Sequence, residues 1–192
     1  MERSDTIVII PTYNEKENIE AIIRAVTSLE KAFDILVIDD GSPDGTADIV
    51  KGLMEGELAG RVYIVERSGK LGLGTAYICG FKWALEHGYD YVIEMDADFS
   101  HSPNDLPRLY AACHEEGYDV SVGSRYITGV NVVNWPIGRV LMSYYASAYV
   151  RTILGISLRD TTAGFVCWSR KVLETICLDD IRFKGYAFQI EM

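Results

Sequence analysis

The stretch YVIEMDADFSH, from Tyr91 to His101, joins a short apolar run to two carboxylates. Its first residues show no alternation with polar ones, which predicts a strand that is buried on both faces. In an extended chain residues i and i+2 point to the same side, so Asp96 and Asp98 can reach one cation together. Carboxylate oxygens suit hard ions such as Mg²⁺ or Mn²⁺. The stretch therefore predicts a metal site at the carboxyl end of a buried strand, with a solvated acidic loop as the alternative.

Four other apolar stretches have the same character, and helical patterns separate them. Strands are predicted at residues 6–11, 35–38, 62–65, 91–93 and 120–123. Helices are expected to begin at Asn14 with Glu17 in the capping-box position, near Thr46, at Thr75 and near Ser102. This alternation predicts a Rossmann-like α/β fold, in which a mostly parallel sheet carries helices on both faces. The length of 192 residues fits a single domain, residues 1–192.

Polar side chains follow four of the five predicted strands. They lie at residues 12–15, at Asp39 and Asp40, at residues 96–98, and at residues 124–125. In open parallel sheets ligands bind in the crevice outside the carboxyl ends of the strands. We therefore expect these four segments to converge on one binding site.

The composition favours a small-molecule ligand over nucleic acid. The formal net charge is −10, and Lys and Arg do not cluster as phosphate backbones require. A phosphate-bearing ligand would need local help from a divalent ion. The four cysteines show no CxxC spacing, so we interpret Cys79, Cys113, Cys167 and Cys177 as reduced core residues of a cytoplasmic protein. We expect neither a signal peptide nor a spanning helix, because no uncharged apolar run reaches about 18 residues.

Several common sites do not fit the sequence. The glycines of residues 69–74 have the wrong order for a dinucleotide fingerprint and follow the third strand, so they predict a loop with tight turns. His87, His101 and His114 lack zinc-site spacing. Neither a Gly-x-Ser-x-Gly elbow nor a P-loop is present in the sequence. The carboxylate pair remains the strongest chemical signal.

Six motifs together resemble a known family. They are PTYNE at residues 11–15, DDGSPDGT at 39–46, KLGLGTAY at 70–77, MDADFSH at 95–101, GSRY at 123–126 and TTAGF at 161–165. In this order they resemble the polyprenyl-phosphate mannosyltransferases, or dolichol-phosphate mannose synthases, of glycosyltransferase family 2. The resemblance covers nearly the whole chain. It implies a GT-A fold, a GDP-mannose donor, Mg²⁺ or Mn²⁺, a polyprenyl monophosphate acceptor in a membrane, and inversion at the sugar carbon.

The resemblance also implies roles for individual residues. The nucleoside would be held by Pro11, Tyr13, Glu15, Ile38 and Asp40. The donor diphosphate and the metal would meet Asp96, Ala97 and Asp98. Phosphates would face Arg125, Arg139 and Ser143, of which the last two belong to the acceptor site. Asp98 and Arg125 are the expected catalytic residues.

The chemistry of such a transfer agrees with these roles. Negative charge builds on the departing diphosphate, and a bound cation stabilises it as a Lewis acid. A phosphate monoester, with a second pKa of roughly 6, is largely a dianion at neutral pH and needs no general base. It does need cationic positioning, and the guanidinium groups of Arg125 and Arg139 can bind phosphate through two parallel hydrogen bonds.

Alternatives remain open for the donor and for catalysis itself. The same chemistry could use another sugar nucleotide such as UDP-glucose, or the protein could be a non-catalytic nucleotide-binding partner of a membrane complex. Residues 137–158 predict a helix that combines apolar residues with Tyr144, Tyr145 and Tyr149. Such a helix can dock on the cytoplasmic face of a membrane as a peripheral element or pack as an ordinary core helix. Residues 188–192 end in mid-pattern, and we expect a chain truncated at its C-terminus.

Overall fold

A computed structural model describes residues 4–125, 137–185 and 187–192, without the side chains of residues 137, 139 and 140. Six strands of this part of the chain form one sheet in the order β3-β2-β1-β4-β6-β5. They are β1 (Thr6–Thr12), β2 (Asp34–Asp39), β3 (Val62–Glu66), β4 (Tyr91–Glu94), β5 (Val120–Val122) and β6 (Val166–Ser169). The first four strands are parallel, and β6 runs antiparallel to β4 and β5. The predicted mostly parallel sheet is confirmed.

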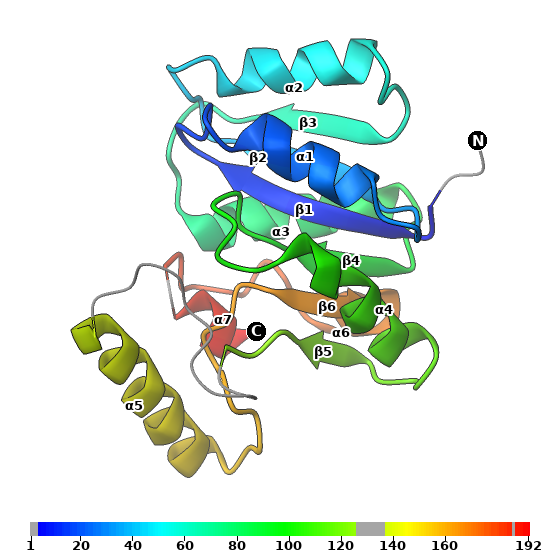
Figure 1. Ribbon diagram of the computed structural model, residues 1–192. Helices are drawn as coiled ribbons and strands as arrows, with labels where there is room; N and C mark the ends of the chain where they lie inside the picture. The colour runs from blue at the N-terminus through cyan, green and yellow to red at the C-terminus, as the bar shows by residue number, and fades with distance from the viewer. Residues whose placement is uncertain (1–3, 126–136, 186) are drawn as a thin grey trace.

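Helices cover both faces of this sheet, as Figure 1 shows. The helices are α1 (Ile19–Thr27), α2 (Thr46–Glu55), α3 (Leu73–Glu86), the 3-10 helix η1 (Pro103–Asp105), α4 (Leu106–His114), α5 (Ile137–Leu154), α6 (Arg170–Thr175) and α7 (Phe188–Glu191). One apolar cluster packs α1, α2 and α4 against the sheet, and a second packs α3, α6 and α7 against the other face. The carboxyl ends of β1 to β4 therefore form one edge between two layers of helices. In the described chain no helix combines the length and apolar character needed to cross a bilayer.

The structure corrects the predicted start of the first helix. Asn14 has a φ of 62° and does not cap it; α1 begins at Ile19 instead. The backbone N–H groups of the intervening loop donate to the β2–α2 turn: Asn14 N to Ser42 Oγ at 3.0 Å and Glu15 N to Thr46 Oγ1 at 3.0 Å. These bonds satisfy the amides that a helix start would have left open. The PTYNE segment is thus held as a loop at the carboxyl edge.

Three further features of the structure differ from the sequence-based picture. The strand β6 lies between β4 and β5, a position that the sequence did not predict. Helix α3 begins at Leu73, two residues before the expected cap, and the Thr75 hydroxyl donates to Gly72 O at 2.7 Å. All four cysteines are free thiols, but Cys177 is exposed and is not a core residue.

Candidate active site

The adjacent carboxylates Asp39 and Asp40 have different roles. Asp39 Oδ1 accepts from Thr12 Oγ1 at 2.8 Å and from Ser42 Oγ at 2.6 Å, while Oδ2 accepts from Ser42 N at 2.9 Å. These bonds fix the end of β1 against the turn after β2. Asp39 is therefore a structural residue of the edge, and its carboxylate is occupied by these donors.

Asp40 is joined to the loop between β3 and α3. Its Oδ1 accepts from Arg67 Nε at 2.6 Å, and its Oδ2 accepts from Leu71 N at 3.3 Å. The Arg67 guanidinium also donates to Thr75 Oγ1 at 2.8 Å. Arg67 and Asp40 are both nearly buried, with exposed side-chain fractions of 10% and 9%. The sequence motifs did not indicate Arg67, because its role follows only from its proximity to Asp40 in the folded protein.

The remaining predicted nucleoside residues differ in how accessible they are. Tyr13 is 39% exposed, and the Lys70 ammonium lies 4.8 Å from the centre of its ring, a cation–π contact. Glu15 and Pro11 are half-buried, and Glu15 Oε2 accepts from Asn18 Nδ2 at 3.0 Å. Ile38 is fully buried in the core and exposes no surface to a ligand in this structure. The edge thus offers an exposed aromatic ring beside the Asp40 ion pair.

Asp96 and Asp98 follow β4 at the centre of the edge. Asp96 Oδ1 accepts from the hydroxyl of Tyr77 in α3 at 3.1 Å, whereas Asp98 is exposed and accepts from Ser100 N at 2.9 Å. Burial raises the pKa of Asp96 to about 6, and the charge of Asp98 adds to the shift. Ala97 between them is buried in the core. The two carboxylates are thus close enough to repel each other.

Arg125, predicted to face phosphates, forms a buried ion pair. Its Nε and Nη2 donate to Asp160 Oδ2 and Oδ1 at 2.7 and 2.8 Å, and Nη2 also donates to Thr162 Oγ1 at 3.0 Å. The backbone N–H of Arg125 donates to Asp160 at 3.1 Å. Burial raises the pKa of the Asp160 carboxyl, but the hydrogen bonds and charge of Arg125 outweigh it and lower this pKa below its usual value. The charge of Arg125 also acts to lower the pKa of Asp96. Asp160 is therefore a second residue that local motifs did not identify.

Two buried titratable groups flank this arrangement. His101 stacks on Phe165 with ring centres 4.9 Å apart, and burial lowers its pKa to about 4, so the ring is neutral at pH 7. Glu94 of β4 is fully buried, and burial raises its pKa to about 8. Its carboxyl accepts from Trp168 Nε1 at 2.7 Å and from Gln189 of α7. Glu94 thus ties β4 to β6 and α7.

The predicted acceptor residues lie on or near α5. Ser143 is half-buried on this helix. The side chain of Arg139 and the loop at residues 128–136 lie outside the described residues, so their predicted roles stay predictions. Within the described ranges no three His, Cys, Asp or Glu side chains gather as a ready-made metal site. A cation at Asp96 and Asp98 would therefore need further oxygen ligands from its substrate or from water.

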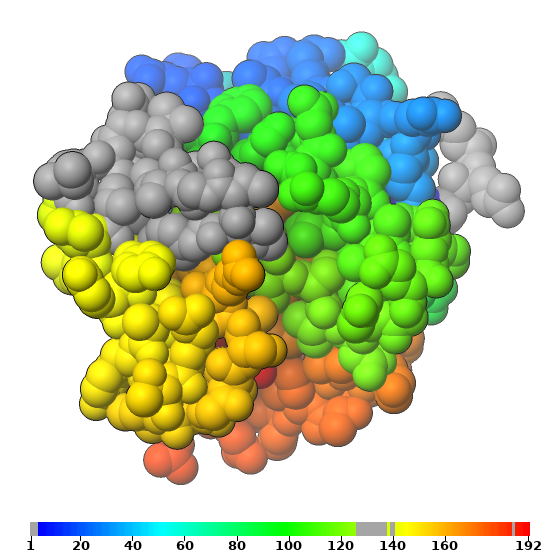
Figure 2. Space-filling view, turned by 60° about the horizontal axis from the view of Figure 1, so that its bottom comes forward, coloured from blue at the N-terminus to red at the C-terminus, as the bar shows by residue number. Residues whose placement is uncertain are grey.

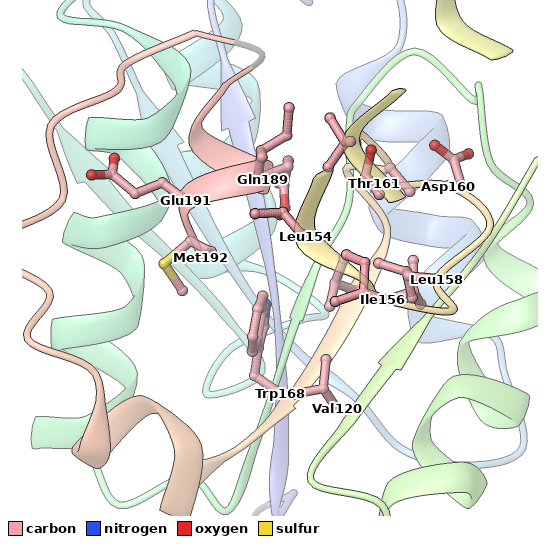
Figure 3. A pocket seen from close by; sticks show the side chains of 15 residues that line it. Val120, Leu154, Ile156, Leu158, Asp160, Thr161, Trp168, Gln189, Glu191 and Met192 are labelled. Carbon is pink, nitrogen blue, oxygen red and sulfur yellow. The ribbon is translucent and has the colours of Figure 1, made fainter. Parts of the chain in front are cut away.

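An apolar cavity of about 440 Å³ adjoins the Arg125 ion pair. Figure 3 shows Trp168 and Val120 on one wall, Leu154, Ile156 and Leu158 on another, and Gln189 and Met192 on the third. Asp160 lines the same cavity, so the partner of Arg125 separates the polar edge from this apolar space.

Helix α5 carries an exposed apolar surface. Figure 2 shows the helix, in yellow, at the lower left of the molecule. Its exposed apolar and aromatic side chains are Leu141, Met142, Tyr144, Tyr145, Tyr149, Ile153 and Leu154. We call these seven residues the α5 surface. Its most exposed member is Met142, at 72%. Seven exposed apolar or aromatic side chains on one helix differ from singly scattered ones, which need no explanation.

The sequence profile of glycosyl transferase family 2 matches residues 7–177. The chain belongs to glycosyltransferase family 2. It is 47% identical over 191 residues to the polyprenol monophosphomannose synthase of Mycolicibacterium smegmatis, covering 97% of this chain and 70% of that protein. It is 44% identical over 186 residues to the undecaprenyl-phosphate mannosyltransferase of Micrococcus luteus, covering 97% of this chain and 75% of that protein. The predicted resemblance and enzyme class are confirmed.

Solved structures of glycosyltransferases share the fold of this family 2 chain. A glucosyl-3-phosphoglycerate synthase from Mycobacterium tuberculosis in complex with UDP has a TM-score of 0.69 at 22% identity, over 98% of this chain and 63% of that one. A mannosyltransferase from Pyrobaculum calidifontis in complex with GDP-Man and Mn²⁺ has a TM-score of 0.62 at 18% identity, over 98% and 51%. These similarities confirm the predicted GT-A fold.

Proposed function

We propose that this glycosyltransferase transfers mannose from GDP-mannose to a polyprenyl monophosphate, with inversion at the sugar carbon and with Mg²⁺ or Mn²⁺ as cofactor. The observation that carries the proposal is the near-half identity to two relatives named for mannose transfer to polyprenol or undecaprenyl phosphate. The arrangement of the carboxyl edge supports this proposal. The exposed ring of Tyr13, the carboxylates of Asp96 and Asp98, and the guanidinium of Arg125, which Asp160 fixes, all lie along this edge.

Asp96 and Asp98 are the proposed cation ligands. Burial and the neighbouring charge raise the pKa of Asp96 to about 6, which means that ionising the pair costs free energy that a bound cation would offset. Mg²⁺ is commonly bound by one or two carboxylates together with substrate phosphates, so two carboxylates suffice. When bound, the cation supplies Lewis-acid stabilisation of the departing diphosphate. Asp98 is the exposed member of this pair.

The nucleoside end of the donor belongs in this proposal at the ends of β1 and β2. Tyr13 offers an exposed ring on which a base can stack, and Lys70 beside it adds positive charge. The Arg67 ion pair fixes the Asp40 carboxylate at the floor of the same region. Glu15 and Pro11, which are half-buried, complete the proposed binding surface.

Arg125 is the proposed cation for the donor phosphates. Its guanidinium is oriented by Asp160, so it does not have to be ordered when a phosphate arrives, which lowers the entropic cost of binding. Arg139 and Ser143 of α5 are the proposed direct partners of the acceptor phosphate. The phosphate oxygen of a dianion is already a nucleophile, so these residues need only hold it in line with the sugar carbon.

The acceptor's hydrocarbon chain requires contact with a bilayer, and the α5 surface is the proposed contact. Leu154 belongs both to this surface and to the wall of the apolar cavity beside Asp160. An apolar path therefore leads from the exposed helix toward the Arg125 ion pair. Aromatic residues of this kind favour the interface between head groups and acyl chains. We propose a peripheral position at the cytoplasmic face of a membrane.

Transfer of radiolabelled mannose from GDP-mannose to a polyprenyl phosphate in detergent or liposomes tests the function. Product that depends on Mn²⁺ or Mg²⁺ is expected, and the product bond should have the inverted configuration. Parallel reactions with UDP-glucose test the donor, because transfer from UDP-glucose alone would contradict the GDP-mannose assignment. If calorimetry in the presence of Mn²⁺ detected binding of neither GDP-mannose nor UDP-glucose, the proposed donor site as a whole would be contradicted.

A further inference from the structure

The carboxylate of Asp96 lies between α3 and the loop before β6. Its Oδ1 accepts the hydrogen bond from Tyr77 at 3.1 Å. On the other side lies Gly164, where a Cβ would be at ordinary contact distance, 3.4 Å, from Oδ2. The hydrogen bond from Tyr77 favours one orientation of the carboxylate before a cation binds.

Packing fixes the hydroxyl of Tyr77. The residue is fully buried, and its ring stacks on Phe188 of α7 at 6.0 Å and on Phe81 at 6.2 Å between ring centres. Helices α3 and α7 are in direct contact next to it, because a Cβ at Gly74 would meet Phe188 at 2.7 Å. A phenol held from both sides in this way donates its hydrogen bond in one direction.

We propose that Tyr77 is a positioning residue for the metal site: its hydroxyl holds Oδ1 of Asp96, so that the carboxylate presents Oδ2 in a fixed orientation. The inference rests on the proposed function, because it takes Asp96 as a cation ligand. Groups that orient a metal ligand typically contribute about 10–100-fold to metal affinity. Tyr77 itself touches neither the cation nor the substrate in this scheme.

Tyr77→Phe, which removes one hydroxyl, tests the proposal, and Tyr89→Phe is the matched control. Tyr89 is also fully buried and also donates to a carboxylate, Asp34 Oδ2, at 2.9 Å. That bond lies at the start of β2, at the opposite edge of the sheet from Asp96. Both variants lose a buried hydrogen bond, so their stability losses in urea unfolding should be similar. Only Tyr77→Phe should weaken Mn²⁺ binding, measured by calorimetry with saturating GDP, by about 10-fold.

Asp96→Asn tells whether Tyr77 acts through the carboxylate. In an Asp96→Asn background Tyr77→Phe should change Mn²⁺ affinity by less than about twofold, because the group it orients no longer carries the charge. If Tyr77→Phe does not fold, 4-fluorophenylalanine at position 77 fills the space of the hydroxyl without donating a hydrogen bond.

The outcomes separate the two proposals. Wild-type protein that binds no Mn²⁺ with GDP would overturn the proposed function. The wild-type protein could instead bind Mn²⁺ and GDP while the Mn²⁺ affinity of Tyr77→Phe equals that of wild type or is no weaker than that of Tyr89→Phe. That result would overturn the positioning role of Tyr77 and leave the proposed function standing. An equal loss from Tyr77→Phe in the wild-type and Asp96→Asn backgrounds would also overturn it.

Discussion

Replacing Asp160 by Asn should destabilise the protein strongly. The Asp160 carboxylate is buried and accepts from Arg125 N, Nε and Nη2, and the guanidinium that it neutralises is only 9% exposed. Removing one partner of a buried ion pair leaves the other charge without compensation, at a cost of about 3–5 kcal/mol. The Asn oxygen still accepts one bond, so we expect the lower end, about 3 kcal/mol. For a chain of this size that corresponds to a fall in Tm of about 6–12 °C.

Urea unfolding at pH 7 measures this effect, and Asp119→Asn is the control. Asp119 pairs with Lys171 at 3.1 Å on the surface, so its loss should cost less than about 1 kcal/mol. The pKa of Asp160 is lowered in the folded protein, so the contribution of the pair is present above the unfolded pKa of about 3.9 and is lost as pH falls through the folded pKa. The difference between wild type and Asp160→Asn should therefore shrink in acid. A cost below about 1 kcal/mol at pH 7 would refute the buried pair.

A double replacement separates stability from function at the same position. Arg125→Met with Asp160→Leu exchanges the ion pair for apolar groups, a change that is often neutral for stability. Stability should return to within about 1 kcal/mol of wild type. Transfer should nevertheless fall by about 10²-fold or more, because the oriented cation is gone. A stable and fully active double variant would show that Arg125 serves the fold alone.

Three other measurements test the metal site and the membrane contact. Asp98→Asn should abolish most metal-dependent GDP binding, because it removes a full charge from the cation site; wild-type affinity in calorimetry with Mn²⁺ would contradict this role. Below the Asp96 pKa of about 6 a proton competes with the cation, so Mn²⁺ affinity should fall about tenfold per pH unit and level off above it; a flat profile from acid to neutral pH would refute the assignment. Leu141 and Met142 are 50% and 72% exposed. Changing both to Asp should prevent flotation with anionic liposomes, while the circular dichroism spectrum stays native. Tyr118→Asp, at an exposed residue outside α5, should leave flotation unchanged; equal flotation of all three proteins would argue against docking through α5.

Local sequence patterns predicted the layers of this fold because its strands satisfy local rules. Residues 7–10 of β1 and 35–38 of β2 are fully buried, so continuous apolar runs indicated them directly. Strand β6 has only four residues, VCWS, and a run of that length carries no usable period. Its place between β4 and β5 depends on antiparallel pairing with residues far away in sequence. The start of α1 depends likewise on distant partners, Ser42 and Thr46.

The same reasoning explains which parts of the site were predicted. Asp40, Asp96 and Arg125 follow strands, so a topological rule brings them to one edge. The side chains that hold them come from other segments: Arg67 is 27 residues from Asp40, Asp160 is 35 from Arg125, and Tyr77 is 19 from Asp96. No local motif encodes such a distance. Contacts of this kind decide whether a charged side chain is neutralised within the protein or remains for a ligand.

This distinction separates the two interpretations of the Asp96 and Asp98 pair. In a solvated acidic loop both carboxylates would be exposed, and water would keep the pKa of each near its usual range. Arginines neutralise Asp40 and Asp160. Asp96 is half-buried and accepts a hydrogen bond from a neutral phenol, and burial together with the charge of Asp98 raises its pKa to about 6. Added positive charge therefore gains more free energy at Asp96 and Asp98 than at the carboxylates already paired with arginine. In a chain with a formal net charge of −10, a divalent cation at this pair is also the most direct way to attract a diphosphate.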